Sequence, residues 1–445
     1  MRDVIFLFLI IVLAVVALRR PVWGIYIFIS LGIINLQSYT WGFGRNLPFA
    51  LIIAICTFGG FVFSKYKGKI PQQREFWAML GLWGLFGLTT MAAYGPGVSE
   101  SSDETLAHFI HVSKILLMVL FSMIVIQTTD QIHILLKVIA LSIGFYAIKG
   151  GLFSIFTGFS NIFWGPENSF LYANNAIGLA LAINIPFLFY LIKIESHKWI
   201  RILMWMMLVL SFPAIIGTFS RGAWLGMFAA TALIFLRSKY KALILITGTI
   251  IISMGLPILS MDVLPERVAQ RFDQLVNYEE DGSAQSRFWN WETCRRVGVN
   301  NPILGKGFNF YSLNMYLEYY PEFIEKYGYN KVWTCHSMWL TVFAEHGIPT
   351  FLLWVSILGM TFLSLRRISL VDIQSPEQYL YPYFSRMLKI GLIVYMVVGT
   401  FLDTAYFDLY YQMIGVVVIL KECQKVFLSN MLVSRPKEAV SRSVE

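Results

Sequence analysis

The sequence predicts an all-α polytopic membrane protein with about twelve or thirteen transmembrane helices. Of its 445 residues, 57% are hydrophobic and only 14% are charged, whereas a soluble protein carries roughly 25% charged residues. Apolar runs of roughly 17–25 residues, the length that spans a bilayer, recur along nearly the whole chain. The Lys and Arg residues gather in alternate connections between these runs, which is the positive-inside pattern. Together these observations indicate a bundle of helices embedded in a membrane.

Thirteen apolar segments predict the individual spans in chain order. They cover residues 4–18, 21–36, 48–64, 76–94, 108–127, 132–155, 172–192, 198–217, 222–236, 242–260, 337–365, 384–402 and 405–421. The first and the ninth are short, so a count of twelve also fits. Thirteen spans would place the N-terminus outside the membrane and the C-terminus inside. With twelve spans the N-terminus moves inside, and everything from the third span onward keeps its side.

The net charge of +9 reflects orientation in the membrane. The basic residues occupy alternate connections, at Arg19–Arg20, 65–74, 193–201, 237–241, Arg366–Arg367 and the tail from residue 421. The connection at residues 93–105 has no basic residue at all. This placement follows the positive-inside rule and forms no polyanion-binding surface. We therefore expect membrane lipid, and no nucleic acid, among the partners.

One connection, on the predicted outer side, is much longer than the others. Within it, "RFWNWETCRRV" (287–297) and the stretch around 268–276 predict amphipathic helices. The glycines and proline of "NNPILGKGFNFY" (300–311) predict turns. The expected domain organisation is therefore N-terminal transmembrane helices (1–260), an outer, periplasmic helical loop (261–335), C-terminal transmembrane helices (336–422) and a cytoplasmic tail (423–445).

Two of the four cysteines, Cys294 and Cys335, lie in this loop. An oxidising exterior would allow a disulfide between them. Closing a loop of this length could contribute about 4 kcal/mol in the chain-entropy model. The alternative is two unpaired thiols.

Several ionisable residues lie near the predicted outer ends of spans, where charge is costly and usually functional. His108, His111 and Lys114 are three residues apart and share one helical face. Lys149 precedes two glycines at the end of the next span. These cations are candidates for substrate binding, and the alternative for each long side chain is snorkelling toward the lipid headgroups.

A second group of outer residues suits phosphate and sugar. In "TFSRGAWLG", Ser220 is placed as a helix N-cap and Arg221 stands in the first turn. A helix N-terminus that carries an arginine is a competent phosphate site, because the guanidinium can bind two phosphate oxygens at once. The adjacent amides of Asn174 and Asn175 suit sugar hydroxyls, although N-capping explains one of them without a ligand.

The stretch "VWTCHSMWLTVFAEHG" (332–347) holds two of the six histidines, His336 and His346. Gly347 and Pro349 are expected to kink the helix, so His346 is expected to be structural. His336 is either a helix-capping imidazole or a base. The chain has no HExxH, no phosphate-binding GxxxxGK[ST] and no DxD, and we expect neither a metal nor a cofactor.

Three motifs resemble the O-antigen ligase family of bacterial inner-membrane glycosyltransferases, which is related to O-antigen polymerases and to some O-linked protein glycosylation ligases. They are "TFSRGAWLG" (218–226), "SAQSRFWNWETC" (283–294) followed by "NPILGKGF" (301–308), and "HSMWLTVFAEHG" (336–347). The N-terminal stretch and "FYAIKGG" (145–151) resemble exosortase-associated O-glycosylation ligases. The resemblance implies a GT-C-like fold, and it implies that Arg221, Arg287 and His336 are the functional residues.

The implied reaction moves a glycan from an undecaprenyl-diphosphate donor to an acceptor hydroxyl, at a site in the bacterial inner membrane that faces the periplasm. Arg221 and Arg287 would neutralise the diphosphate, while His336 would accept the proton of the hydroxyl. Direct attack by the acceptor would invert the anomeric centre. The acceptor stays open among a lipid A–core sugar, a protein hydroxyl and a growing glycan. A lipid-linked glycan transporter is the alternative from another class, although the outward bias of the cations disfavours it.

Overall fold

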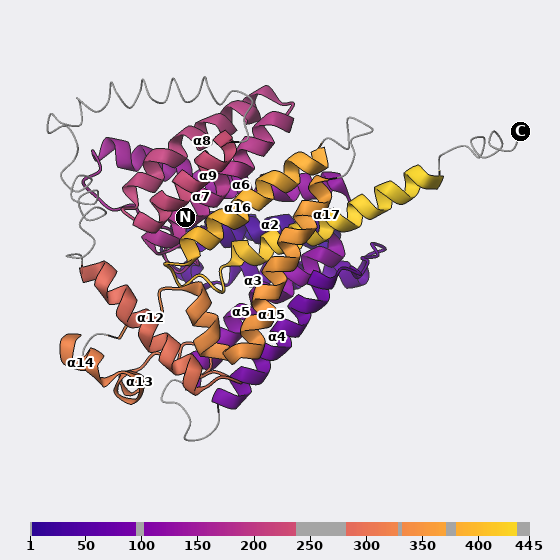
Figure 1. The fold of residues 1–445 in the computed structure, drawn as a ribbon. Coiled ribbons are helices and arrows are strands. Elements are labelled where there is room, and N and C mark those ends of the chain that lie inside the picture. The colour runs from indigo at the N-terminus through magenta and orange to yellow at the C-terminus, as the bar shows by residue number, and fades with distance from the viewer. Residues whose placement is uncertain (1, 95–101, 237–281, 328–331, 371–379, 434–445) are drawn as a thin grey trace, which may run out of the picture.

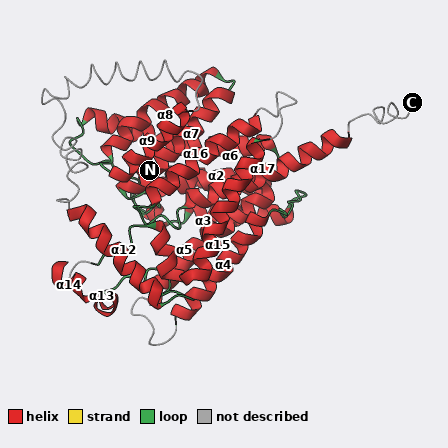
Figure 2. Ribbon diagram, in the orientation of Figure 1, coloured by secondary structure: helices red, strands yellow, loops and turns green. Residues whose placement is uncertain are grey.

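The computed structural model describes residues 2–94, 102–236, 282–327, 332–370 and 380–433. Every regular element within these residues is a helix (Figure 2). The all-α polytopic fold class is therefore confirmed. The span expected at residues 242–260, the amphipathic helix expected around 268–276 and the basic connection at 237–241 lie outside the described residues.

Twelve of the thirteen predicted spans coincide with helices in the described part of the chain. The first nine are α1 (Arg2–Arg19), α2 (Pro21–Ile34), α3 (Phe49–Phe63), α4 (Arg74–Ala93), α5 (Ser102–Val125), α6 (Thr129–Phe156), α7 (Asn174–Ile194), α8 (Lys198–Gly217) and α9 (Arg221–Leu236). The last three are α15 (Met338–Ser369), α16 (Leu380–Gly399) and α17 (Asp408–Val433). Seven of the described helices are long and apolar enough to cross a membrane, and α2, α3 and α9 are shorter apolar helices.

The long connection contains three helices in its described part. They are α12 (Gly282–Asn300), α13 (Leu313–Tyr319) and α14 (Pro321–Tyr327). Figure 1 shows them together at one side of the bundle. The helix expected at residues 287–297 is confirmed as part of α12, and the expected turns at 300–311 are also confirmed.

Local sequence explains where the helices begin and bend. Pro21 starts α2 directly after α1, because proline fits the first turn of a helix. Thr128 and Gln131 form a capping box at the start of α6. The predicted kink in α15 is confirmed, since Gly347 leaves the helical conformation at φ +72.

Helix α7 lies at the centre of the bundle, where it packs against α6, α8, α9 and α16. Most of its residues are buried inside the protein. Helices α1, α2 and α3 pack against one another, and α2 joins them to α6. Helices α4, α5, α15 and α17 complete the bundle, and α12 packs against α15.

The two ends of the bundle are held together differently. At one end, the Lys421 ammonium donates to both carboxylate oxygens of Glu75 at 2.8 Å, and Ser364 donates to the same carboxylate. This buried group ties α4, α15 and α17 together. The other end, where α15 begins, holds the connections around His336, and we call it the His336 end. It is the end that the basic-residue pattern predicts to face outward.

Candidate active site

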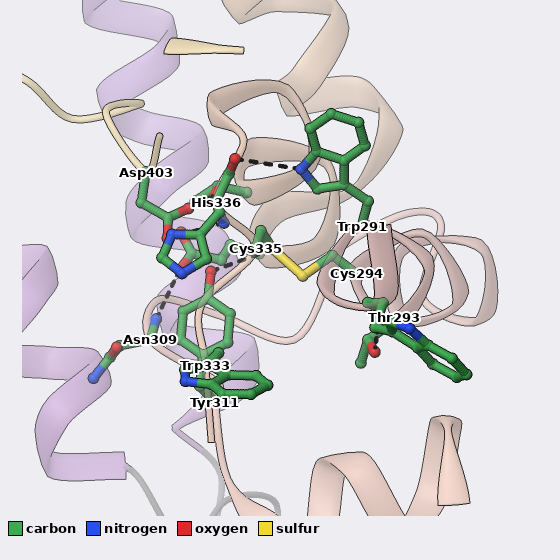
Figure 3. The surroundings of a disulfide bond; sticks show 12 residues. Trp291, Thr293, Cys294, Asn309, Tyr311, Trp333, Cys335, His336 and Asp403 are labelled. Carbon is green, nitrogen blue, oxygen red and sulfur yellow. Dashed lines mark hydrogen bonds and ion pairs between the residues drawn. A yellow bond between two sulfur atoms is a disulfide. The ribbon is translucent and has the colours of Figure 1, made fainter. Parts of the chain in front are cut away.

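His336 lies in the short segment between the long connection and α15, with its backbone in a left-handed conformation at φ +49. This conformation is uncommon for a residue with a side chain and persists where surrounding contacts hold it. The backbone N–H of His336 donates to Asp403 Oδ2 at 3.2 Å, and its carbonyl accepts from Trp291 Nε1 at 3.3 Å. Two distant segments therefore hold the backbone that carries the imidazole (Figure 3).

Asp403 comes from the connection between α16 and α17 and faces the imidazole. Its Oδ2 lies 4.0 Å from His336 Nδ1. Its Oδ1 accepts a hydrogen bond from Thr341, in the first turn of α15. The His336 side chain is 36% exposed and that of Asp403 is 24% exposed. The pair is thus anchored by protein contacts but still open to a reactant.

The surroundings favour the neutral form of His336. Burial lowers its pKa below the usual value, the Asp403 carboxylate acts in the opposite direction, and the Arg287 guanidinium adds to the lowering. A histidine with a lowered pKa is unprotonated at neutral pH and can accept a proton. This effect of Arg287 indicates that its guanidinium lies within electrostatic reach of His336.

A disulfide fixes α12 beside His336. Cys294 and Cys335 are joined, with their Cα atoms 5.8 Å apart, and Tyr311 donates to Cys335 Sγ at 3.3 Å. On α12, Arg287, Trp291 and Cys294 are spaced four and three residues apart, so they share one face of the helix. Since Trp291 bonds to His336 and Cys294 to Cys335, this face is turned toward the site (Figure 3).

The other arginines of α12 are engaged elsewhere. Arg295 and Arg296 pair with Glu292 at 2.8 and 2.9 Å, and these hydrogen bonds lower the pKa of Glu292 to about 2. The Arg296 guanidinium also lies 4.0 Å from the ring centre of Tyr320. The Arg296 contact holds α12 to the segment that joins α13 and α14, whereas the pairs with Glu292 lie within α12. Of the three α12 arginines, Arg287 is the one whose charge acts on His336.

Arg221 begins α9, and the expected N-cap at Ser220 is confirmed. Ser220 Oγ accepts from the backbone N–H of Ala223 at 3.3 Å. Asn174 Nδ2 donates to the carbonyl of Thr218 at 2.8 Å and so ties the first turn of α7 to the turn that precedes α9. The N-cap position of α7 itself is Ala173, which has no side-chain hydrogen bond.

The start of α9 adjoins the start of α15 through the end of α16. A Cβ atom built on Gly222 would lie 3.6 Å from Val398, and one built on Gly399 would lie 2.5 Å from the Met338 sulfur. Arg221 precedes Gly222, and His336 is two residues before Met338. The helix N-terminus that carries Arg221 therefore opens at the His336 end of the bundle.

Two family models match parts of the chain. Residues 206–355 match the family model described as O-antigen ligase. This match supports the resemblance to that family, and we call residues 206–355 the O-antigen ligase segment. Residues 1–196 match a family of unknown function, DUF5935. No curated protein matches the chain.

The O-antigen ligase segment contains Arg221, Arg287 and His336. Asp403 lies beyond its end and enters the site through the fold alone. The other sequence candidates (Lys114, Lys149, Asn174 and Asn175) lie in the segment that matches the family of unknown function. The likeness of this N-terminal part to exosortase-associated O-glycosylation ligases stays a prediction.

These N-terminal candidates lie in different surroundings. Lys149 Nζ is 3.4 Å from the Tyr39 hydroxyl and stands over its ring. Lys114 lines a cavity between α2, α3, α5 and α17. Asn175 is half-buried in the first turn of α7. None of these contacts is with the segment that carries His336.

A buried polar cluster near the start of α15 was not predicted. Glu345 Oε2 accepts from the Tyr406 hydroxyl at 2.5 Å, and that hydroxyl lies 2.9 Å from His346 Nε2. His346 Nδ1 lies 2.7 Å from the Thr89 hydroxyl, and the imidazole is fully buried. The expectation that His346 is structural accords with these contacts.

The same cluster anchors the turns of residues 301–310. The backbone N–H of Asn309 donates to Glu345 Oε1 at 2.9 Å, and that of Gly307 donates to the Glu345 carbonyl at 2.8 Å. Ile348 N–H donates to the Pro302 carbonyl at 2.7 Å. The kink at Gly347 exposes the backbone groups that these turns bind. The long connection is therefore held to α15 at two places: by the disulfide at Cys335, just before the helix, and by these hydrogen bonds around the kink at Gly347.

Proposed function

We propose that this protein transfers a glycan from undecaprenyl diphosphate to an acceptor hydroxyl, and that the His336 end of the bundle faces the periplasm from the bacterial inner membrane. The observation that carries the proposal is the grouping of Arg287, His336 and Asp403 beside the N-terminus of α9, all but Asp403 from the O-antigen ligase segment. In this proposal the connection at residues 261–335 lies on the periplasmic side of the membrane.

The first requirement is to stabilise the leaving group. Breaking the bond between the sugar and the phosphate leaves an undecaprenyl diphosphate that carries the bonding electron pair. Arg221 stands on a capped helix N-terminus whose backbone N–H groups favour anions. Arg287 approaches from α12. Two preorganised cations on different elements can neutralise the developing charge, and no metal is needed for this step.

The second requirement is a base for the acceptor. His336 is neutral because its surroundings lower its pKa, so it can take the hydroxyl proton as the new bond from oxygen to the anomeric carbon forms. The resulting imidazolium is stabilised by the Asp403 carboxylate 4.0 Å away. Attack opposite the leaving diphosphate inverts the anomeric centre. The proton passes from His336 to solvent after product release.

The proposed acceptor is a lipid A–core sugar. A protein hydroxyl or a growing glycan would require the same bond chemistry, because these acceptors all attack through an oxygen atom. A lipid-linked glycan transporter would not require a neutral histidine beside an arginine. The positions of Arg287 and Asp403 around His336 therefore support transfer over transport.

Reconstitution of the purified chain with a defined undecaprenyl-diphosphate oligosaccharide tests this proposal. Lipid A–core, a hydroxyl-bearing protein and the same lipid-linked glycan are offered in turn as acceptors. We expect one glycosylated product and an equal amount of released undecaprenyl diphosphate. Movement of the intact donor between leaflets without release would refute the proposal in favour of transport.

Arginine variants test the diphosphate site. Arg221→Lys and Arg287→Lys keep the charge but lose the planar fork, so each is expected to reduce kcat/KM by at least tenfold. Arg201→Lys, at the opposite end of the bundle in α8, is the matched control and is expected to behave as wild type. Equal activity of all three variants would mean that the two outer arginines do not bind the donor.

A further inference from the structure

A cavity of about 310 Å³ lies beside the first turns of α17. Its walls come from α2, α3, α5 and the first turns of α17, with the loop at residues 168–170 at one end. None of Arg221, Arg287, His336 or Asp403 lines it. The cavity is therefore separate from the candidate active site, and most of its walls belong to the segment that matches a family of unknown function.

Most of the polar side chains that line the cavity lie toward its His336 end, among apolar neighbours such as Phe49 and Phe170, while Ser122 lies deeper. The polar side chains toward the His336 end are Asn35, Gln37, His111, Lys114, Asn168, Ser169, Asp408 and Gln412. Deeper in the bundle its walls are mostly aliphatic and aromatic, as at Phe28, Ile29, Met118 and Leu135. A cavity lined in this way suits an amphipathic ligand whose headgroup lies at the His336 end and whose chain points into the bundle.

The cavity reaches the protein surface between α3 and α5, where exposed side chains line it. These helices meet near their far ends, where Phe58 and Phe61 pack on Phe121 at ring-centre distances of 5.7 and 5.3 Å. At the other end the cavity lies between them. Leu51 and Leu117 line this part and are 46% and 51% exposed. A lipid could thus enter sideways from the bilayer.

The polar groups specify the headgroup. Lys114 is exposed at the cavity and offers a cation for a phosphate. Asp408 Oδ1 and Gln412 Oε1 are buried acceptors that have no hydrogen-bond partner among the described residues. Buried acceptors of this kind need donors, and a phosphodiester offers none, whereas hydroxyl groups do. A headgroup that carries both a phosphate and hydroxyls would suit these three residues.

We propose that this cavity is a binding site for a lipid with a phosphorylated, hydroxyl-bearing headgroup, with the phosphate at Lys114 and the hydroxyls at Asp408 and Gln412. The site is distinct from the donor site at Arg221 and Arg287 and does not depend on glycan transfer. It adjoins the reaction centre through α17, because Asp408 follows the connection that carries Asp403. Phe407 in that connection packs on Phe170, whose loop lines the cavity, at 5.3 Å.

A glycine offers a direct test of occupancy. Gly32 of α2 lines the cavity, and a Cβ atom built on it would have no neighbour within 4 Å. Gly32→Phe should therefore fill the cavity without disturbing the helix. Gly84 of α4 also has open space around a built Cβ but does not line the cavity, so Gly84→Phe is the matched control.

Binding of phosphatidylglycerol to the purified full chain in detergent is measured by native mass spectrometry across a lipid titration. We expect Gly32→Phe to weaken binding at least tenfold and Gly84→Phe to leave it unchanged. Lys114→Gln should weaken it about tenfold, while Lys198→Gln, at the opposite end, should not. Thermal melting of each variant verifies folding, and Gly32→Leu replaces Gly32→Phe should the larger residue prevent folding.

Three further ligands test the chemistry of the headgroup. Diacylglycerol lacks the phosphate, phosphatidic acid lacks the hydroxyls, and glycerol 3-phosphate lacks the chains, so each is expected to bind at least tenfold more weakly than phosphatidylglycerol. Equal binding of phosphatidylglycerol by wild type and Gly32→Phe would overturn the proposal. Binding of glycerol 3-phosphate as tightly as the lipid would overturn it too, since the site would then take a free phosphate compound.

Discussion

Asp403→Asn separates the charge of Asp403 from its shape. The asparagine can keep both contacts, because its carbonyl oxygen can accept the His336 N–H and its amide can donate to the Thr341 hydroxyl. Only the negative charge beside the imidazole disappears. Any change in catalysis then reports electrostatic support of His336.

The distance sets the size of the effect. Two unit charges 4.0 Å apart interact by about 1 kcal/mol in water and about 4 kcal/mol at an effective dielectric constant near 20. His336 and Asp403 are 36% and 24% exposed, so solvent screening favours the lower part of this range, about 1–2 kcal/mol. Since about 1.4 kcal/mol corresponds to one pKa unit, the variant should lower the His336 pKa by about one unit.

The sign follows from the role of the base. His336 is active when unprotonated, and loss of a nearby anion disfavours the protonated form. The acid limb of kcat/KM against pH should therefore move about one unit lower in Asp403→Asn. The plateau should fall about tenfold, because the imidazolium formed during transfer loses its partner.

Transfer to a saturating acceptor is measured from pH 4 to pH 9 for wild type and for Asp403→Asn. Asp103→Asn is the control, since Asp103 is an exposed carboxylate near the same end of the bundle. An acid limb that stays in place or moves to higher pH would refute the assignment of His336 and Asp403 as a coupled pair. A plateau equal to that of wild type would refute the stabilising role of Asp403.

Three further changes test the framework of the site. Replacing both Cys294 and Cys335 by Ser opens a disulfide between residues 41 positions apart, which should remove up to about 4 kcal/mol of stability; an unchanged melting temperature would contradict this. Gly347→Ala places a side chain at φ +72 and 2.5 Å from a loop carbonyl oxygen. The free energy of unfolding should therefore fall by at least about 1–2 kcal/mol, and the melting temperature should fall with it. Gly359→Ala, on the same helix with open space, should have no such effect. Ser220→Ala removes the N-cap of α9, so it should lower the free energy of unfolding by about 1 kcal/mol and raise the KM for the donor. Ser220→Thr keeps a capping hydroxyl and should keep both values near those of wild type. An unchanged KM in Ser220→Ala would show that the cap does not support donor binding.

The helices could be predicted because their signals are local. Each span is a run of apolar residues long enough to cross a bilayer, and this length requires no knowledge of neighbours. The N-cap at Ser220 and the kink at Gly347 are likewise set by the residue types at those positions. Most of the predicted ends agree with the structure to within a few residues, although α5 begins six residues earlier and α17 ends twelve residues later than predicted.

The partners of His336 could not be predicted in the same way. Asp403 is 67 positions away in the sequence, and only the packing of α15 against α16 brings it to His336. The predicted spans did leave residue 403 between two helices on the outer side, so its side of the membrane could be inferred. Its contact with the imidazole could not, because a single sequence carries no long-range pairing signal.

The buried cluster at Glu345 shows the same limit. A glutamate inside an apolar helix indicates a partner, but the sequence does not say that the partner is Tyr406, 61 positions later. Arg287 could be predicted as a functional residue from the family resemblance. The structure adds that the disulfide and Trp291 turn the face of α12 that carries Arg287 toward His336.

Transfer by His336→Ala is the measurement that tests the central claim most directly. Donor binding and single-turnover glycan transfer are measured on the same preparation, with His197→Ala, near the opposite end of the bundle, as the control. The account predicts that His336→Ala binds the undecaprenyl-diphosphate glycan within about threefold of wild type and loses at least about a hundredfold in transfer rate. A transfer rate equal to that of wild type would show that His336 is not the base.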